Sequence, residues 1–192
     1  MREIDTIYDC IYMKLLLSWT QNKPNVSAHD HKWNVYAAAF HNCAKKWLKK
    51  LDPYILQNRE ENKVYLKPLI NQTTCNVITL GIGNDVEAEK SLKKLHPTCS
   101  FIGVDPDNAT NQDLYEKDLG GKFIHAAVGG TGNDIHKLDP KGGGYYNTKF
   151  PQMEFKKFLK EYANFPLIDM IIIDAEFSEY LMLPILAGDS FM

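Results

Sequence analysis

From Cys75 onward the chain alternates short apolar runs with longer amphipathic stretches, and this alternation constrains the fold more than any other feature. The apolar runs have the length of buried strands, and the stretches between them carry apolar residues at helical spacing. Strands that alternate with helices form a mostly parallel sheet with right-handed crossovers, so we predict an α/β fold. The predicted strands cover residues 77–80, 101–104, 122–128 and 167–173, and the predicted helices cover residues 85–95, 111–119, 152–163 and 176–186.

The residues before Cys75 show a different pattern, which predicts two amphipathic helices. The first extends over residues 4–19 and the second over residues 33–51. Pro24 lies between them, where proline cannot continue a helix interior. We therefore expect a helical N-terminal part that differs in class from the remainder.

Residues 52–74 are polar and weakly patterned, and we expect a connector with a short helix at residues 54–58. The predicted domains are a helical N-terminal extension, residues 1–74, and an α/β domain, residues 75–192.

Composition excludes several classes of protein. The chain has 192 residues, of which 44% are hydrophobic, so it can bury a core and is not disordered. Lys and Arg number 22 against 24 Asp and Glu, a net charge of −2, so no nucleic-acid partner is expected. No apolar run approaches the roughly 18 residues of a membrane span, and none is expected.

The four cysteines, Cys10, Cys43, Cys75 and Cys99, are widely spaced and form no C-x-x-C pair. No Cys/His spacing resembles a zinc site, so we predict no metal. A chain of this size does not need disulfides to fold. We therefore predict reduced thiols that pack as small hydrophobic residues.

Residues 11–19 are apolar, but charged residues interrupt their neighbourhood and no small-residue cleavage site follows. We therefore predict a cytoplasmic location. Three Asn-x-Ser/Thr sequons, at Asn25, Asn71 and Asn108, have no significance unless the chain is secreted.

Gly81 and Gly83 stand where the first predicted strand turns into a helix. Two glycines there let the backbone approach a ligand closely and direct amide groups at it, although a tight turn alone explains the pair equally well. Asp85 occupies the position of a third glycine, and its carboxylate would repel a pyrophosphate at the helix N-terminus. A ligand without phosphate suits this turn better, which disfavours a nicotinamide-dependent oxidoreductase.

Asp105 follows the second predicted strand, 22 residues after Gly83. An acidic residue about 20 residues beyond such a turn binds the ribose hydroxyls in nucleotide-binding folds. The alternative is a turn or helix-capping role before Pro106. We favour ribose binding because the order is strand, glycine turn, helix, strand and acid.

Three carboxylates, Asp174, Glu176 and Glu179, follow the fourth predicted strand at the edge where α/β folds bind ligands. Glu176 and Glu179 are three residues apart and share a helical face, which would hold a cation or a general base. The alternative is that acidic residues simply favour a helix N-terminus.

Together these motifs resemble the S-adenosyl-L-methionine-dependent methyltransferases of the FkbM-like kind, from about Cys75 to the end of the chain. The resemblance implies a class I, Rossmann-like fold and methyl transfer to a hydroxyl of a small or sugar-like acceptor. The stretches that carry it, in order, are Thr79–Gly83, Val104–Pro106, His125–Gly129 and Ile173–Tyr180.

The resemblance also implies roles for single residues in binding the cofactor, S-adenosyl-L-methionine. Gly81 and Gly83 would border its methionine part, and Asp105 would bind the ribose. A further run would border the adenine, namely Ala126, Ala127 and Val128.

On the same resemblance, Asp174 and Glu176 would lie nearest the methyl group and the acceptor, and either would serve as the base. Two residues depart from the family pattern: Thr79 stands where an acid is usual, and Phe177 replaces a glycine. These departures, with the early end of the chain, support an alternative. In it the chain is a truncated, catalytically inactive member that acts as a ligand- or protein-binding module.

About three strands of such a methyltransferase are missing after residue 192, so the fourth predicted strand is expected at a sheet edge. An uncovered edge strand pairs readily with other chains. We therefore expect the N-terminal helices, a partner chain or self-association to cover it.

Overall fold

The structure is a computed structural model that describes residues 10, 13, 28–59, 61–67, 74–129, 134–138, 145–175 and 178–188. The chain divides into two compact units, and each is described by itself. One comprises Met1–Tyr54 and Val64–Lys67, and the other comprises Ile55–Lys63 and Pro68–Met192.

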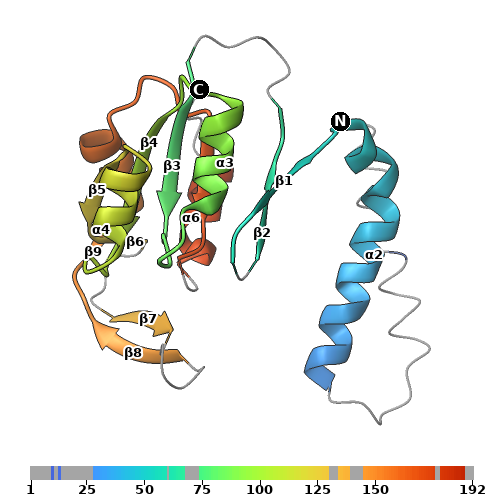
Figure 1. Ribbon diagram of the computed structural model, residues 1–192. Coiled ribbons are helices and arrows are strands. Elements are labelled where there is room, and N and C mark those ends of the chain that lie inside the picture. Colours follow the sequence, from blue (N-terminus) through green and yellow to red (C-terminus); the bar gives the residue numbers. More distant parts are fainter. Residues whose placement is uncertain are drawn as a thin grey trace. The chain divides into compact units, whose positions relative to one another are not determined.

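A four-stranded parallel sheet forms the centre of the larger unit, in the order β10-β3-β4-β5 (Figure 1). Its strands are β3 (Asn76–Leu80), β4 (Ser100–Asp105), β5 (Lys122–His125) and β10 (Met170–Ile173). All five residues of β3 are buried, as in a central strand. The prediction of a parallel α/β sheet is confirmed. Within the described residues β10 pairs with β3 alone, so its predicted edge position is confirmed too.

Helices cover both faces of this sheet because successive side chains of a strand point to opposite faces. Ile78 and Leu80 pack against Phe155 on one face, and Thr79 bonds to Glu89 on the other. The first face carries α5 (Phe155–Lys157), the short π-helix η2 (Phe158–Ala163) and α6 (Glu179–Gly188). The second carries α3 (Glu87–Leu95), α4 (Asn111–Asp113) and the π-helix η1 (Leu114–Asp118).

The predicted single strand over residues 122–128 is wrong in one respect: it is two strands with different partners. β5 ends at His125, and β6 (Ala127–Gly129) pairs in parallel with β9 (Gln152–Glu154) instead of with β4. The break falls at Ala126, whose N–H donates to the carbonyl of Asp105 (3.2 Å). An unbroken apolar run does not reveal such a change of partner.

Two further pairs of strands were not predicted. β1 (Tyr54–Gln57) and β2 (Asn62–Tyr65) form a two-stranded sheet, so the short helix predicted at residues 54–58 is wrong. β7 (Asp134–Leu138) and β8 (Tyr145–Lys149) pair antiparallel.

In the smaller unit, α2 (Ala28–Lys50) confirms the second N-terminal helix. The first predicted helix lies outside the described residues except for Cys10 and Met13, which are helical. None of the helices in the described ranges is long and apolar enough to cross a membrane.

The prediction of reduced thiols is wrong, because disulfides join Cys10 to Cys43 and Cys75 to Cys99. The second pair bridges the residue before β3 and the residue before β4, which are neighbouring strands. The N–H of Ser100 donates to the carbonyl of Cys75 (2.7 Å) at the same place. Sequence spacing does not show which strands are neighbours, so it could not show this pairing.

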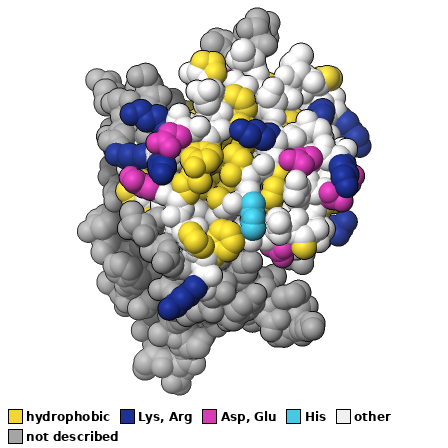
Figure 2. Space-filling model, turned by 90° about the vertical axis from the view of Figure 1, so that its left-hand side faces the viewer, with side chains coloured by type: hydrophobic (Ala, Val, Ile, Leu, Met, Phe, Trp, Pro, Cys, Tyr) yellow, Lys and Arg dark blue, Asp and Glu magenta, His cyan; other side chains and the backbone are white. Residues whose placement is uncertain are grey.

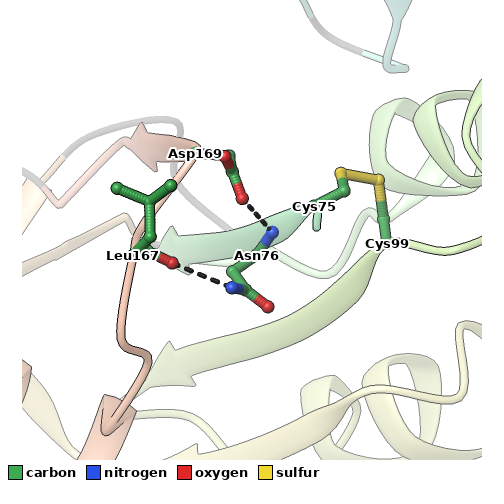
Figure 3. Close-up of a disulfide and its surroundings, with 5 residues drawn as sticks. All are labelled: Cys75, Asn76, Cys99, Leu167 and Asp169. Atoms are coloured by element: carbon green, nitrogen blue, oxygen red, sulfur yellow. Dashed lines mark hydrogen bonds between the residues drawn. A yellow bond between two sulfur atoms is a disulfide. The ribbon is translucent and has the colours of Figure 1, made fainter. Parts of the chain in front are cut away.

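The disulfide and the Ser100 bond join β3 and β4 at their amino ends. Polar contacts join β10 to β3 at the same end of the sheet (Figure 3). The backbone N–H of Asn76 donates to Oδ2 of Asp169 (2.7 Å), and its side-chain amide donates to the carbonyl of Leu167 (2.8 Å). The amino ends of β3, β4 and β10 are thus fastened together. The glycine turn lies at the opposite edge of the sheet, at the carboxyl end of β3.

The surface on the side where Figure 1 draws β5 and β9 carries hydrophobic side chains near its middle (Figure 2). Charged side chains of both signs surround them, so this face has no field of a single sign.

Tyr115 fills the space between η1 and the sheet. It is fully buried, and an added Cβ on Gly103 or Gly121 would fall 2.5 Å or 2.9 Å from its ring. Its hydroxyl donates to Oγ1 of Thr79 (3.0 Å). The two glycines therefore make the room that this ring occupies.

We expect Gly103→Ala to lower the free energy of unfolding by about 1–3 kcal/mol, because its methyl group overlaps the Tyr115 ring in a closely packed layer. Urea denaturation measures this change. In a Tyr115→Leu background the same substitution should cost clearly less. An equal cost in both backgrounds would show that the overlap is not the cause.

Candidate functional site

The turn after β3 requires glycine at its first position for two reasons. Gly81 has a φ of +81°, and a Cβ there would lie 1.9 Å from the backbone oxygen of Asp174. Gly83 also has a positive φ, of +63°, but a Cβ there would meet nothing within 4 Å. The turn is therefore packed against the end of β10 on one side and open at Gly83.

The carboxylate of Asp105, at the end of β4, holds this turn in place. Its Oδ2 accepts from the backbone N–H groups of Ile82 (2.8 Å) and Gly83 (3.3 Å), and its Oδ1 accepts from that of Asp107 (2.7 Å). Asp105 is only 7% exposed. A carboxylate has about four acceptor positions, so capacity remains for a ligand hydroxyl.

Asn111 is a second residue that fastens the turn, and the sequence analysis missed it. Its Oδ1 accepts from the N–H of Asn84 (2.8 Å), and its Nδ2 donates to the carbonyl of Asp107 (2.9 Å). The side chain is almost fully buried. An asparagine at the start of a helix resembles an ordinary capping residue, so no pattern in the sequence distinguishes Asn111.

The N-terminus of α3 is already occupied by side chains. Oδ1 of Asp85 accepts from the N–H of Glu87 (3.0 Å), and Oδ1 of Asn58 accepts from that of Ala88 (2.7 Å). The other oxygen of Asp85 accepts from the N–H of Arg59 (2.6 Å). These contacts favour a ligand without phosphate, because a phosphate would need the same amides.

Asp174 lies directly beside the glycine turn. Its N–H donates to the carbonyl of Leu80 (2.8 Å), and its half-exposed carboxylate pairs with Nζ of Lys63 (3.1 Å). Lys63 also pairs with Glu61. Burial alone would lower the pKa of Lys63, but the hydrogen bonds to Glu61 and Asp174 outweigh it and leave the pKa raised. The sequence pattern does not single out Lys63, because it predicts a connector where β2 lies.

The other two carboxylates that follow β10 belong to Glu176 and Glu179. Glu176 lies outside the described residues. Oε1 of Glu179 accepts from the N–H of Ala175 (2.6 Å), so this side chain caps the turn before α6. For Glu179 the helix-terminus alternative is therefore the one that the contacts support.

The segment after β5 begins beside Asp105, through the bond from the N–H of Ala126 described above. The chain then continues as β6. At its end, a Cβ on Gly129 would lie 2.8 Å from Cβ of Ser178, so β6 reaches the start of α6. The predicted adenine-contacting residues are all buried, namely Ala126, Ala127 and Val128.

A buried carboxylate stands beside Thr79, the residue that replaces the acid usual in the family pattern. Oγ1 of Thr79 donates to Oε1 of Glu89 (2.8 Å), which comes from α3. Oε2 of Glu89 is buried and has no hydrogen-bond partner in the described part of the chain. Burial raises the pKa of Glu89; the Thr79 bond and the charge of Lys63 oppose this rise without cancelling it.

The carboxyl edge of the sheet thus brings together four of the predicted residues: Gly81, Gly83, Asp105 and Asp174, with Ala126 next to them. Carboxylates and backbone amides lie at this edge, and the positive charge of Lys63 is paired with Glu61 and Asp174. Such a set of groups suits a ligand that carries hydroxyls and positive charge.

The family model described as the methyltransferase FkbM domain matches residues 25–191, which include α2 and the β1–β2 pair as well as the sheet. No curated protein and no solved structure matches the chain.

The raised pKa of Glu89 predicts how stability depends on pH. Between the ordinary value of 4.5 and the higher native value, the folded state holds more protons than the unfolded state, so stability falls as pH rises. In Glu89→Gln this side chain cannot titrate. The free energy of unfolding of the variant should therefore rise relative to that of the wild type as the pH rises above 4.5. Urea denaturation over this pH range measures the difference.

The matched control is Glu87→Gln on the same helix, whose carboxylate is exposed and pairs with Lys90. It should not reproduce the relative gain in stability expected of Glu89→Gln. If Glu89→Gln and the wild type kept a constant difference in stability across the range, the raised pKa would be refuted.

Proposed function

The chain belongs to the methyltransferase FkbM domain family, and we propose that it transfers the methyl group of S-adenosyl-L-methionine to a hydroxyl of a small, sugar-like acceptor. Family membership supports a methyltransferase in general. The observation that carries the finer proposal is the Asp105 carboxylate, bonded to the amides of the glycine turn at the carboxyl edge of the Rossmann-like sheet. In this proposal residues 75–192 form the methyltransferase domain, and the extension of residues 1–74 contains the β1–β2 pair as well as α2.

The groups at this edge fit the proposed cofactor. When bound, S-adenosyl-L-methionine supplies a methyl group on a positively charged sulfur. A nucleophilic oxygen would bond to the methyl carbon as the carbon–sulfur bond breaks. Asp105 would accept a hydrogen bond from a ribose hydroxyl with its remaining capacity, and the open space at Gly83 leaves room beside the turn. The buried run from Ala126 to Val128 would border the adenine.

The acceptor side is proposed to involve Asp174 and Glu176. Methyl transfer mainly requires alignment of the two reactants, and a carboxylate would take the hydroxyl proton as the acceptor oxygen bonds to carbon. The position of Asp174 is fixed by its backbone bond to Leu80 and by the fit against Gly81. Lys63 holds the Asp174 carboxylate at this edge through the ion pair.

One observation favours a second candidate, a catalytically inactive member that binds ligands or proteins. The Asp174 carboxylate is already paired with Lys63, so an acceptor would have to compete for it. An inactive member would bind the cofactor product or a protein and show no turnover on any acceptor.

We expect calorimetry to detect micromolar binding of S-adenosylhomocysteine to the folded chain, and Asp105→Ala to weaken it at least tenfold. A hydrogen bond to a charged group contributes about 1.5–3 kcal/mol, which corresponds to about 10–100-fold in affinity. Asp113→Ala, which removes an exposed carboxylate paired with Lys117, should leave the affinity unchanged.

Because Asp105 also holds the turn, thermal unfolding of Asp105→Ala must accompany the calorimetry. Asp105→Asn retains the shape and one acceptor oxygen and should bind with intermediate affinity. Failure of the folded wild type to bind S-adenosylhomocysteine would overturn the proposal.

For the chemical step, we expect Asp174→Asn or Glu176→Gln to lower kcat about 100-fold or more, since general-base catalysis contributes about 10²–10⁴-fold. Release of S-adenosylhomocysteine is measured on the best substrate from a panel of methyl glycosides and hydroxy acids. Glu116→Gln, an exposed substitution on η1, is the control. Equal kcat values for all variants would exclude both carboxylates as the base.

A further inference from the structure

We propose that Asn108 is an N-glycosylation site and that the chain matures in an oxidising, secretory compartment. Two independent observations carry this inference: the pairing of all four cysteines, and the exposure and geometry of the sequon Asn108-Ala109-Thr110. The inference goes beyond the proposed function and does not depend on it.

The disulfides indicate the compartment. Disulfides persist in secreted and endoplasmic-reticulum proteins and are rare in the cytosol, where thiols are kept reduced. One pair, Cys10–Cys43, lies in the smaller unit and the other, Cys75–Cys99, in the larger, so each unit has its own. This pattern supports a different compartment from the cytoplasmic location that we predicted because the sequence shows no signal-peptide pattern.

The sequon at Asn108 has the exposed position that a glycosylation acceptor needs. Asn108, Ala109 and Thr110 are all exposed and lie in the turn between β4 and α4. Thr110 stands at the N-cap of α4, where a threonine hydroxyl ordinarily bonds to a helix amide, but here it makes no such bond. Among the described residues, the hydroxyl that the glycosylating enzyme must recognise therefore caps no helix amide.

The modification is a group transfer from a lipid-pyrophosphate-linked oligosaccharide. Nδ2 of Asn108 forms a bond to the anomeric carbon of the first sugar as the bond from that carbon to the pyrophosphate oxygen breaks. The lipid pyrophosphate leaves with the electron pair, and the amide loses one proton to a base of the enzyme. Burial would prevent this reaction, and the Asn108 turn is exposed.

The glycan would grow from the same edge of the sheet as the candidate site. Asn108 is three residues after Asp105, and its backbone carbonyl accepts from the N–H of Gln112 (3.4 Å) at the start of α4. A bulky, hydrated chain there would shield this edge from other proteins.

The test expresses the full chain in insect cells and analyses its tryptic peptides by mass spectrometry after peptide N-glycosidase treatment in heavy-oxygen water. We expect Asn108 to be recovered as labelled aspartate. Asn108→Gln and Thr110→Ala should both abolish the label, and the matched variant Thr110→Ser, which keeps a sequon, should retain it. Two variants at different residues separate loss of the sequon from failure to fold.

Thiol status is measured on the same protein by maleimide labelling before and after reduction. We expect labelling only after reduction. Free thiols in the isolated chain, an unmodified Asn108, or glycans confined to Asn25 and Asn71 would each overturn the proposal. Binding of S-adenosylhomocysteine is assayed separately, so the proposed function and this inference can fail independently.

Discussion

The candidate site depends on one buried carboxylate. Asp105 accepts three backbone N–H groups, two of them from the turn after β3, and so joins the ends of two neighbouring strands. A buried carboxylate left without such donors would cost several kcal/mol, so turn and acid require each other. The parallel sheet makes this possible because the carboxyl ends of β3 and β4 meet at one edge. Asp174, at the end of β10, reaches the same edge through Gly81.

The sheet and the turn could be predicted because their signals are local. The apolar run of β3 and the glycines after it specify a buried strand and a tight turn without reference to the rest of the chain. Lys63 and Glu89 could not be found in this way. Lys63 belongs to a short strand with mixed polarity, and Glu89 resembles any acidic residue in a first helical turn, so only tertiary contacts reveal them.

The cysteines show how a tertiary contact changes the meaning of a sequence pattern. Their wide spacing matched reduced thiols, and the lack of a signal-peptide pattern matched a cytoplasmic location in which sequons have no meaning. Strand adjacency reverses the first of these interpretations, because it brings Cys75 beside Cys99 at the start of β3 and β4. The sequon at Asn108 then becomes relevant, although nothing in its own three residues has changed.

The disulfide at the amino ends of β3 and β4 has a consequence for the integrity of the polypeptide. The Cys75–Cys99 bond encloses the whole of β3, the glycine turn and α3 in one covalent loop. A protease that cut a peptide bond inside this loop would leave both fragments attached. The nicked product would migrate as one chain under non-reducing conditions, and its fragments would separate only when a reductant is added.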